Sequence, residues 1–187
     1  MIIETIFSTV DEMGQPNFAP MGILWGEEEL TVRPFRQSRT CHNLLATGYG
    51  VANLTDDVLA FVQSGLYDAV LPHFSASTVP GVVFQKACSW RELEVIAATG
   101  TPDRAEVHCR VVGKGWQRDF LGFNRARSAV VEAAILATRL HLLDLATVVE
   151  SLDRYEVIVK KTGDEAETTA FEWVREFVRR WSSARDN

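Results

Sequence analysis

Three arginines within seven residues are the side chains in this sequence that most suggest chemistry. They are Arg33, Arg36 and Arg39, and no acidic residue lies among them, although the chain as a whole carries a formal net charge of −6. Guanidinium groups form short, charge-assisted hydrogen bonds with phosphate and carboxylate. The arginines therefore predict an anion site. The alternative is that they are solvated, or that they pair with acids elsewhere in the fold.

A helix is predicted to begin beside the third arginine. Ser38 is a suitable N-cap, Thr40 adds a second hydroxyl group, and Gly48 is placed to end the helix. A helix N-terminus carries positive partial charge, so a cation there is unfavourable unless an anion is present. Free N–H groups, hydroxyls and guanidinium groups at one helix start suit phosphate. We interpret this segment as a phosphate cradle, although it lacks the specificity of a Walker loop.

The elements before and after this helix are predicted to be short strands. Mixed β-branched, aromatic and polar residues predict strands at 2–10, 17–25, 29–34, 49–54, 90–101 and 104–116. In the last of these, Val107, Cys109 and Val111 alternate with polar residues. Tight turns between short strands favour an antiparallel meander over a βαβ unit. We predict a small antiparallel β-barrel, with Thr55 or Asp56 capping a short helix after the fourth strand.

The last third of the chain is predicted to be mostly helical. Residues 123–145 are rich in Ala, Leu and Val, and their apolar positions cover more than one stripe, so this helix is expected to be buried or at an interface. Apolar residues recur at helical spacing from Phe171 to Trp181, which predicts a final amphipathic helix. Between them, the segment RYEVIVKK at residues 154–161 predicts one further strand.

We therefore expect a fold that is mainly β with helices (α+β), in two parts. Residues 1–118 form the barrel core, and residues 119–187 form a helical portion whose further strand packs on the barrel. Arg125 and Arg127 follow the predicted cap Asn124, again the unfavourable charge for a helix start. They are either a second edge of the anion site or partners for acids, and the residues alone leave both interpretations open.

Composition and motifs exclude several classes of function. An acidic chain is unsuited to non-specific nucleic-acid binding, and no apolar run approaches the ~20 residues of a membrane span. The N-terminus MIIETIF lacks the features of a secretory signal, and 3 irregularly spaced cysteines suit a reducing cytoplasm. We expect a cytoplasmic protein.

Other site chemistries are disfavoured by spacing. Cys41-His42 and His108-Cys109 are adjacent pairs whose side chains point in different directions, so we expect no metal site. Neither G-x-S-x-G nor G-x-G-x-x-G occurs. Cys41 stands among arginines, which could lower its pKa, but a small buried residue is the first expectation. A phosphate cradle on an antiparallel barrel favours a mononucleotide-type cofactor.

Three segments together resemble a known family. They are NFAPMGILW, VRPFRQSRTCHNL and GFNRARSAVVEAAILATRLHLL, and the likeness is strongest in APMG at 19–22 and RPFRQSRTCHNL at 33–44. The family comprises flavin-binding proteins of uncharacterised function from archaea and methanopterin-using bacteria, with the FMN-binding split-barrel fold. The likeness spans nearly the whole chain. It implies FMN as cofactor and a homodimer with FMN near the subunit interface.

The resemblance also implies a set of cofactor-binding residues. Arg33, Ser38 and Thr40 would hold the phosphate, and the main chain around Pro20 would pass close to the flavin ring, where Gly22 has no Cβ to obstruct it. The full set is Met21, Gly22, Arg33, Pro34, Ser38, Arg39, Thr40, Asn43, Asn53, Thr55 and Arg125.

The other members of this set have roles that the resemblance implies less directly. Arg39 and Asn43 would lie near the phosphate, Asn53 and Thr55 would reach the ribityl chain or the ring, and Arg125 would come from the helical portion. Simpler alternatives stay open. Gly22 could form only a β-bulge, and the two asparagines could only satisfy backbone groups.

The sequence leads to three hypotheses about function. The first is an FMN-dependent oxidoreductase acting on an unidentified small cytoplasmic substrate, with a pterin-related compound suggested only by the organisms in which the family occurs. The second is a non-catalytic flavin carrier or sensor, which the absence of a recognisable acid–base constellation favours. The third is a binding module for another phosphorylated metabolite. Fold analogy does not decide among them, and no catalytic residue is predicted.

Overall fold

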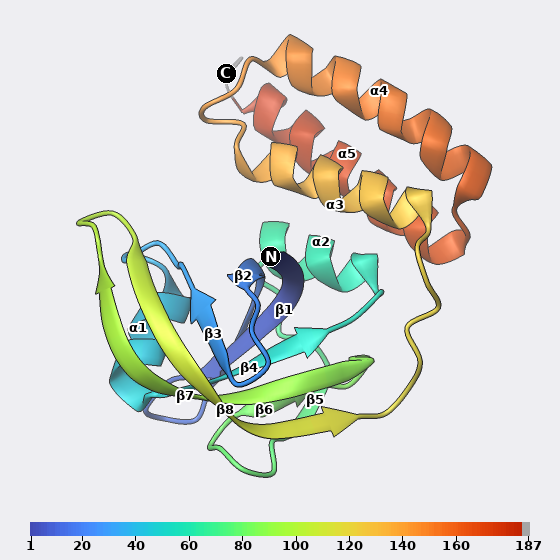
Figure 1. The fold of residues 1–187 in the computed structure, drawn as a ribbon. Helices are drawn as coiled ribbons and strands as arrows, with labels where there is room; N and C mark the ends of the chain where they lie inside the picture. Colours follow the sequence, from blue (N-terminus) through green and yellow to red (C-terminus); the bar gives the residue numbers. More distant parts are fainter. Residues whose placement is uncertain (185–187) are drawn as a thin grey trace. The chain divides into compact units, whose positions relative to one another are not determined.

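The structure is a computed structural model that describes residues 1–184. The chain forms two compact units (Figure 1). One comprises Met1–Thr55 and Ala69–Phe120, and the other comprises Asp56–Asp68 with the residues from Leu121 onward. The two units are described separately below.

The first unit is a closed antiparallel β-barrel. Its strands are β1 (Ile2–Val10), β2 (Pro16–Leu24), β3 (Glu29–Val32), β4 (Tyr49–Leu54), β7 (Ser89–Gly100) and β8 (Ala105–Trp116). They pair in the order β1-β2-β3-β8-β7-β4, with every neighbouring pair antiparallel. The predicted antiparallel barrel is confirmed, and each predicted strand matches to within two residues at its ends.

Alternating strand residues fill the barrel interior, as the sequence predicts. Val107 and Cys109 of β8 are completely buried, and Phe7 of β1 faces them from across the same core. Burying one side chain of this size stabilises a fold by about 1.5–3 kcal/mol. The helix α1 (Arg39–Thr47) adds Cys41 and Leu44 to this core, so it is held against the barrel by apolar packing.

The predicted limits of α1 are confirmed. Ser38 is the N-cap, and its Oγ accepts a hydrogen bond from the Cys41 N–H at 3.2 Å. At the other end Gly48 adopts a left-handed conformation with φ of 79°, which glycine adopts without steric cost.

A small hairpin lies against the outer face of the barrel. It comprises β5 (His73–Ser75) and β6 (Val82–Phe84). The Ser8 hydroxyl donates to the Val82 carbonyl at 2.6 Å, which ties the hairpin to β1.

The loop inside this hairpin is fixed by a buried carboxylate. Glu92 is 1% exposed, and it accepts hydrogen bonds from the backbone N–H groups of Ser77, Thr78 and Val79 at 2.5–3.1 Å. The Ser77 hydroxyl and the Trp90 indole N–H donate to it as well. Desolvation acts to raise the pKa of Glu92, but these hydrogen bonds together outweigh it and hold the pKa below its ordinary value.

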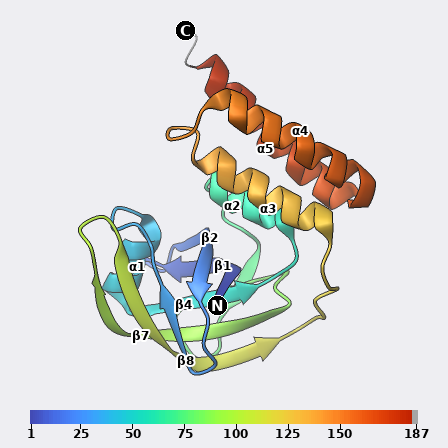
Figure 2. The same ribbon diagram turned by 45° about the horizontal axis from the view of Figure 1, so that its top comes forward.

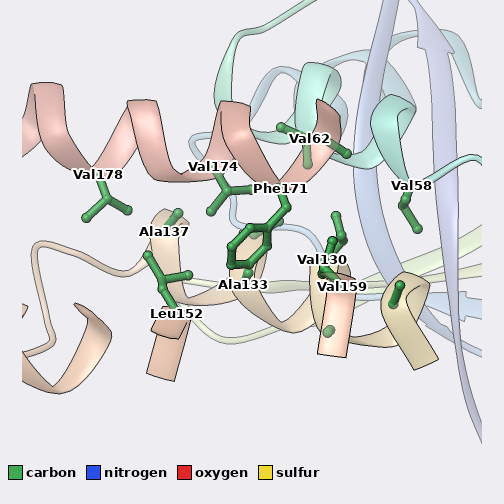
Figure 3. Packing of buried hydrophobic residues seen from close by; sticks show 14 of the residues in the cluster. Val58, Val62, Val130, Ala133, Ala137, Leu152, Val159, Phe171, Val174 and Val178 are labelled. Atoms are coloured by element: carbon green, nitrogen blue, oxygen red, sulfur yellow. The ribbon is translucent and has the colours of Figure 1, made fainter. Parts of the chain in front are cut away.

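The second unit is a bundle of α2 (Val58–Leu66), α3 (Arg125–Thr138), α4 (Leu145–Thr162) and α5 (Glu165–Ser183) (Figure 2). Phe171 and Val174 of α5 point toward the alanine-rich face of α3, where Ala133 and Ala137 leave room for them (Figure 3). The long helix predicted over 123–145 is real but ends earlier, at Thr138, and its predicted cap Asn124 is confirmed.

Two predictions for this part of the chain are wrong. Residues 154–161 form the end of α4, not a strand, because Leu152 and Val159 are buried at helical spacing on one face. The cap of α2 is Asp57, whose carboxylate accepts from the Ala60 N–H at 3.2 Å, and neither Thr55 nor Asp56. In addition, α2 packs with α3 and α5, so this segment belongs with the helical unit although it interrupts the predicted barrel core.

Candidate functional site

The arginine-rich segment lies along the tip of the β7–β8 hairpin. Phe35 pairs with Arg104 through two main-chain hydrogen bonds. The Arg36 N–H donates to the Asp103 carbonyl, and the Ala105 N–H donates to the Pro34 carbonyl. This pairing fixes the path of the chain immediately before α1.

Two of the three arginines hold this segment in place. Arg33 forms an ion pair with Glu106, with a closest approach of 2.7 Å between Nη2 and Oε2. Arg36 donates from Nε to the Thr101 carbonyl at 2.7 Å and from Nη2 to the Thr99 carbonyl at 3.1 Å. The alternative of pairing with an acid therefore describes Arg33, whereas Arg36 bonds to main-chain carbonyls.

Arg104 is a further part of this segment that the sequence did not indicate. Its guanidinium group lies 3.9 Å from the centre of the Phe35 ring, and its Nη1 donates to the Arg33 carbonyl at 3.2 Å. Only the antiparallel pairing of residue 35 with residue 104 brings these side chains together, and no local pattern signals that pairing.

The start of α1 retains the unbalanced positive charge that the sequence predicts. Arg39 is exposed, and within residues 1–184 it has no ion-pair or hydrogen-bond partner. The first turn contains no acidic residue. The Cys41 N–H is satisfied by Ser38, whereas the N–H groups of Arg39 and Thr40 have no acceptor in the described part of the chain. Two free donors, a helix dipole and a guanidinium group thus meet at one point, which favours an anion.

Behind this helix start lies a buried polar network that joins α1 to the first two strands. The Asn17 side-chain amide donates to the Thr40 hydroxyl at 3.1 Å and to the Thr9 hydroxyl at 3.5 Å. The Asn43 amide donates to the same Thr9 hydroxyl at 3.1 Å. Thr40 and Asn43 are 2% and 5% exposed. The network therefore places the beginning of β2, at Asn17, directly beside the predicted cradle.

From that point β2 runs along the open edge of the barrel. It pairs with β1 along its whole length, but with β3 only at Leu24, which is opposite Thr31. The Trp25 N–H donates to the Met1 carbonyl, so these two residues form a hydrogen-bonded pair. Hydrogen-bonded pairs alternate with non-hydrogen-bonded pairs along an antiparallel ladder, so the odd-numbered residues of β2 bond to β1. The main-chain groups of the even-numbered residues of β2 therefore point away from β1. Pro20 and Gly22 have no strand opposite them on that side among the described residues.

The open edge and the cradle are separated by a short length of strand. From Asn17 to Pro20 the strand advances about 10 Å. An added Cβ at Gly22 would lie 2.9 Å from both the Glu4 carboxylate and the Ile2 side chain, so a larger residue there would force these two exposed side chains of β1 to move. Neighbouring Met21 is partly buried against the barrel core.

The remaining predicted site residues lie in varied environments. Asn53 is completely buried, and its amide bonds to the Ile6 carbonyl and the Phe84 N–H, so it satisfies backbone groups as the simpler alternative proposed. The Thr55 hydroxyl donates to the Lys86 carbonyl at 3.0 Å. Pro34 is buried in the segment before α1.

The two arginines at the start of α3 differ in role. Arg125 is exposed, whereas Arg127 forms ion pairs of 2.9 Å with both Asp56 and Glu167, whose side chains are about 5% exposed. The hydrogen bond to Glu167, supported by the charge of Asp56, raises the pKa of Arg127. Arg127 is therefore a structural partner for two acids of the helical unit.

Neither Cys41 nor Cys109 is activated as a thiolate. Burial raises the pKa of the Cys41 thiol despite the opposing charge of Arg36, so the lowered pKa considered from the sequence is not found. Burial also raises the pKa of Cys109 to about 12. Among residues 1–184 no three Cys, His, Asp or Glu side chains lie close enough to hold a metal ion. Within the same range, no helix is long and apolar enough to cross a membrane.

An antiparallel barrel that is closed between β2 and β3 by the Leu24–Thr31 pair alone, in a chain that also contains a helical bundle, defines an α+β split-barrel protein. Two family models match the chain, one described as the N-terminal domain of a protein of unknown function (DUF447) over residues 3–118, the other as DUF447 over residues 124–176. The chain belongs to the DUF447 family.

Solved structures agree with this classification. The chain is similar to the FMN-bound DUF447 protein MM1853 from Methanosarcina mazei, with 29% identity, a TM-score of 0.82 and 94% of each chain covered. It shares its fold with an FMN-binding protein from Thermus thermophilus, at 19% identity and a TM-score of 0.54, covering 60% of this chain and 68% of that one. A flavoredoxin from Methanosarcina acetivorans shares the fold at 12% identity and a TM-score of 0.55, covering 65% and 72%.

Proposed function

We propose that this protein binds FMN, with the phosphate at the start of α1 and the flavin ring along the open edge of β2. The observation that carries the proposal is the hydrogen bond of 3.1 Å between Asn17 and Thr40. This hydrogen bond joins the start of α1, which has unpaired N–H donors, to β2. About 10 Å further along β2 the main chain is unpaired on one side. A ligand with a phosphate at one end and a flat ring at the other requires both features. The similarity to a protein whose crystal structure holds FMN supports the choice of ligand.

The roles of the predicted residues follow from their contacts. Arg39 is the cation for the phosphate, because Arg33 and Arg36 are engaged in holding the preceding segment. The backbone N–H groups of Arg39 and Thr40 complete the donor set, and the N-cap Ser38 sets their direction.

The ring subsite is formed mainly by the main chain. At Gly22 an N–H and a carbonyl face the opening and are available to the polar edge of a flavin. Asn53 ties β4 to β1 and to β6, and Asn43 ties α1 to Thr9 of β1, so both act as supports for this arrangement. The roles of Thr55 and Arg125 stay predictions.

The reaction class we propose is a flavin-dependent oxidation or reduction of a small cytoplasmic substrate by a homodimer. Bound FMN supplies the redox chemistry, so the protein needs chiefly to bind and orient the ring and to set its hydrogen bonds. The site we assign is suited to binding and orienting FMN, because it consists of an anion cradle and an open strand edge. It contains no cluster of acids and bases among residues 1–184. Turnover with a reductant and an acceptor separates this reaction class from a non-catalytic flavin carrier.

The experiment compares two single substitutions by titrating FMN and following its fluorescence. Arg39→Ala removes the proposed phosphate contact, and we expect the Kd for FMN to rise roughly tenfold, as for the loss of a hydrogen bond to a charged group. Arg110→Ala is the matched control, because Arg110 is an exposed barrel arginine that pairs with Glu94. An equal effect of both variants would contradict the assignment, and a wild-type protein that does not bind FMN would end the proposal.

A further inference from the structure

The Thr40 hydroxyl group has an unused hydrogen. Its oxygen accepts from Asn17 at 3.1 Å, and no acceptor for its own O–H is found among residues 1–184. Two other hydroxyls of α1 and its cap donate to main-chain carbonyls, Ser38 to Phe35 at 2.7 Å and Thr47 to Asn43 at 2.8 Å, whereas Thr9 in the same network accepts two bonds as Thr40 accepts one. At 2% exposure Thr40 has little access to water, and a buried donor without an acceptor is unfavourable.

Asn17 determines what that hydroxyl can do. Its amide nitrogen donates to the Thr40 oxygen and to the Thr9 oxygen, so the amide is held between two acceptors. Thr9 in turn accepts from Asn43, which comes from α1, so the network is anchored at both of its ends. With one lone pair of its oxygen engaged by Asn17, Thr40 still has its O–H to donate to a further group.

We propose that Asn17 is a positioning residue for the phosphate of the bound cofactor, acting by holding the Thr40 hydroxyl in the orientation that donates to a phosphate oxygen. The inference rests on the proposed placement of the phosphate at the start of α1. The two free N–H groups at Arg39 and Thr40 lie at the same helix start, so the hydroxyl adds a third donor to them. Asn17 itself need not touch the ligand.

The test uses two ligands that differ only in the phosphate. FMN and riboflavin are titrated into each variant by fluorescence, and the ratio of the riboflavin Kd to the FMN Kd measures how much the phosphate contributes. Asn17→Ala should reduce this ratio roughly tenfold, as for a hydrogen bond to a charged group, with the riboflavin Kd unchanged. A merely structural role would change the affinity for both ligands alike.

Two further variants make the result specific. Thr40→Val should reduce the ratio to a similar extent, and Asn17→Ala combined with Thr40→Val should reduce it no further, because both substitutions remove the same contact. Thr47→Val is the matched control, since the Thr47 hydroxyl donates to the Asn43 carbonyl at the other end of α1 and is not part of this network, and its ratio should remain that of the wild type. Asn17→Leu keeps roughly the size of the side chain and removes the donor without adding charge, so it replaces Asn17→Ala if that variant does not fold.

The outcomes separate this inference from the function on which it rests. A wild-type protein that binds FMN no more tightly than riboflavin would overturn the placement of the phosphate itself. If the wild type discriminates between the two ligands and Thr40→Val loses the discrimination, but neither Asn17 variant does, then the phosphate placement stands and the role of Asn17 is wrong. Additive losses in the double variant would likewise overturn the proposed route through Thr40.

Discussion

At the scale of single residues, side chains of the same type have different partners. The sequence predicts Arg33, Arg36 and Arg39 as one cradle, yet two of them bond to the β7–β8 hairpin and only Arg39 is left for an anion. Residue type and spacing predicted the positive charge and the helix start correctly. They could not predict the partners, because Glu106 and Thr101 approach only through long-range strand pairing.

Contacts between residues distant in the sequence also explain which residues the sequence did not indicate. Asn17 lies 23 positions before Thr40, and nothing local to it indicates a hydrogen bond to a helix start. Glu92 reads as one polar position in an ordinary strand, although it is the acceptor for a whole loop. Its burial depends on how the β5–β6 hairpin packs on the barrel.

Glu92 gives a prediction at this scale. Its pKa is lowered in the folded protein, so its contribution to stability is present above the pKa of the unfolded chain, about 4.3, and is lost as the pH falls through the folded value. Glu92→Gln should therefore lower the free energy of unfolding by about 1–3 kcal/mol at pH 7, because it leaves donors of Ser77 to Val79 poorly satisfied. Urea denaturation of both proteins at pH 7 and near pH 3 measures this.

The difference between wild type and Glu92→Gln should shrink on acidification, since protonation of Glu92 itself removes the same charge. A difference that is constant across this pH range would show that the ionised carboxylate is not what holds the loop.

At the scale of elements, the strands and the caps of α1 and α3 were predicted correctly, whereas the cap of α2 and one strand were not. The strands and the limits of α1 are confirmed because alternation, turn residues, Ser38 and Gly48 all indicated the same structure. In the segment RYEVIVKK, β-branched residues favoured a strand. Packing of Leu152 and Val159 against α3 and α5 decided in favour of a helix, which is a tertiary effect that the local sequence does not contain.

A matched pair of valines tests the corrected element. In a strand Val157 and Val159 would share one face, whereas in α4 Val157 is 66% exposed and Val159 is 2% exposed. Val159→Ala should lower the free energy of unfolding by about 2 kcal/mol through lost burial and a cavity. Val157→Ala should change it by less than about 0.5 kcal/mol. Thermal unfolding followed by circular dichroism distinguishes the two, and equal losses would support the strand.

At the scale of the whole molecule, both compact units belong to one family. The family models cover the barrel and most of the helical bundle, and MM1853 matches 94% of the chain. The α+β class and the antiparallel barrel were predictable from the sequence, because periodicity and turn composition determine them. The grouping of α2 with α3 and α5 was not, since a nine-residue apolar helix carries no sign of where it packs.

The central claim is that this molecule holds FMN by its phosphate at the start of α1. The most direct measurement is a calorimetric titration of the purified wild-type protein with FMN and, in parallel, with riboflavin. We predict binding of both, with FMN tighter by a factor of at least ten, the equivalent of about 1.4 kcal/mol from the phosphate. Equal affinities, or no binding of either flavin, would contradict the claim.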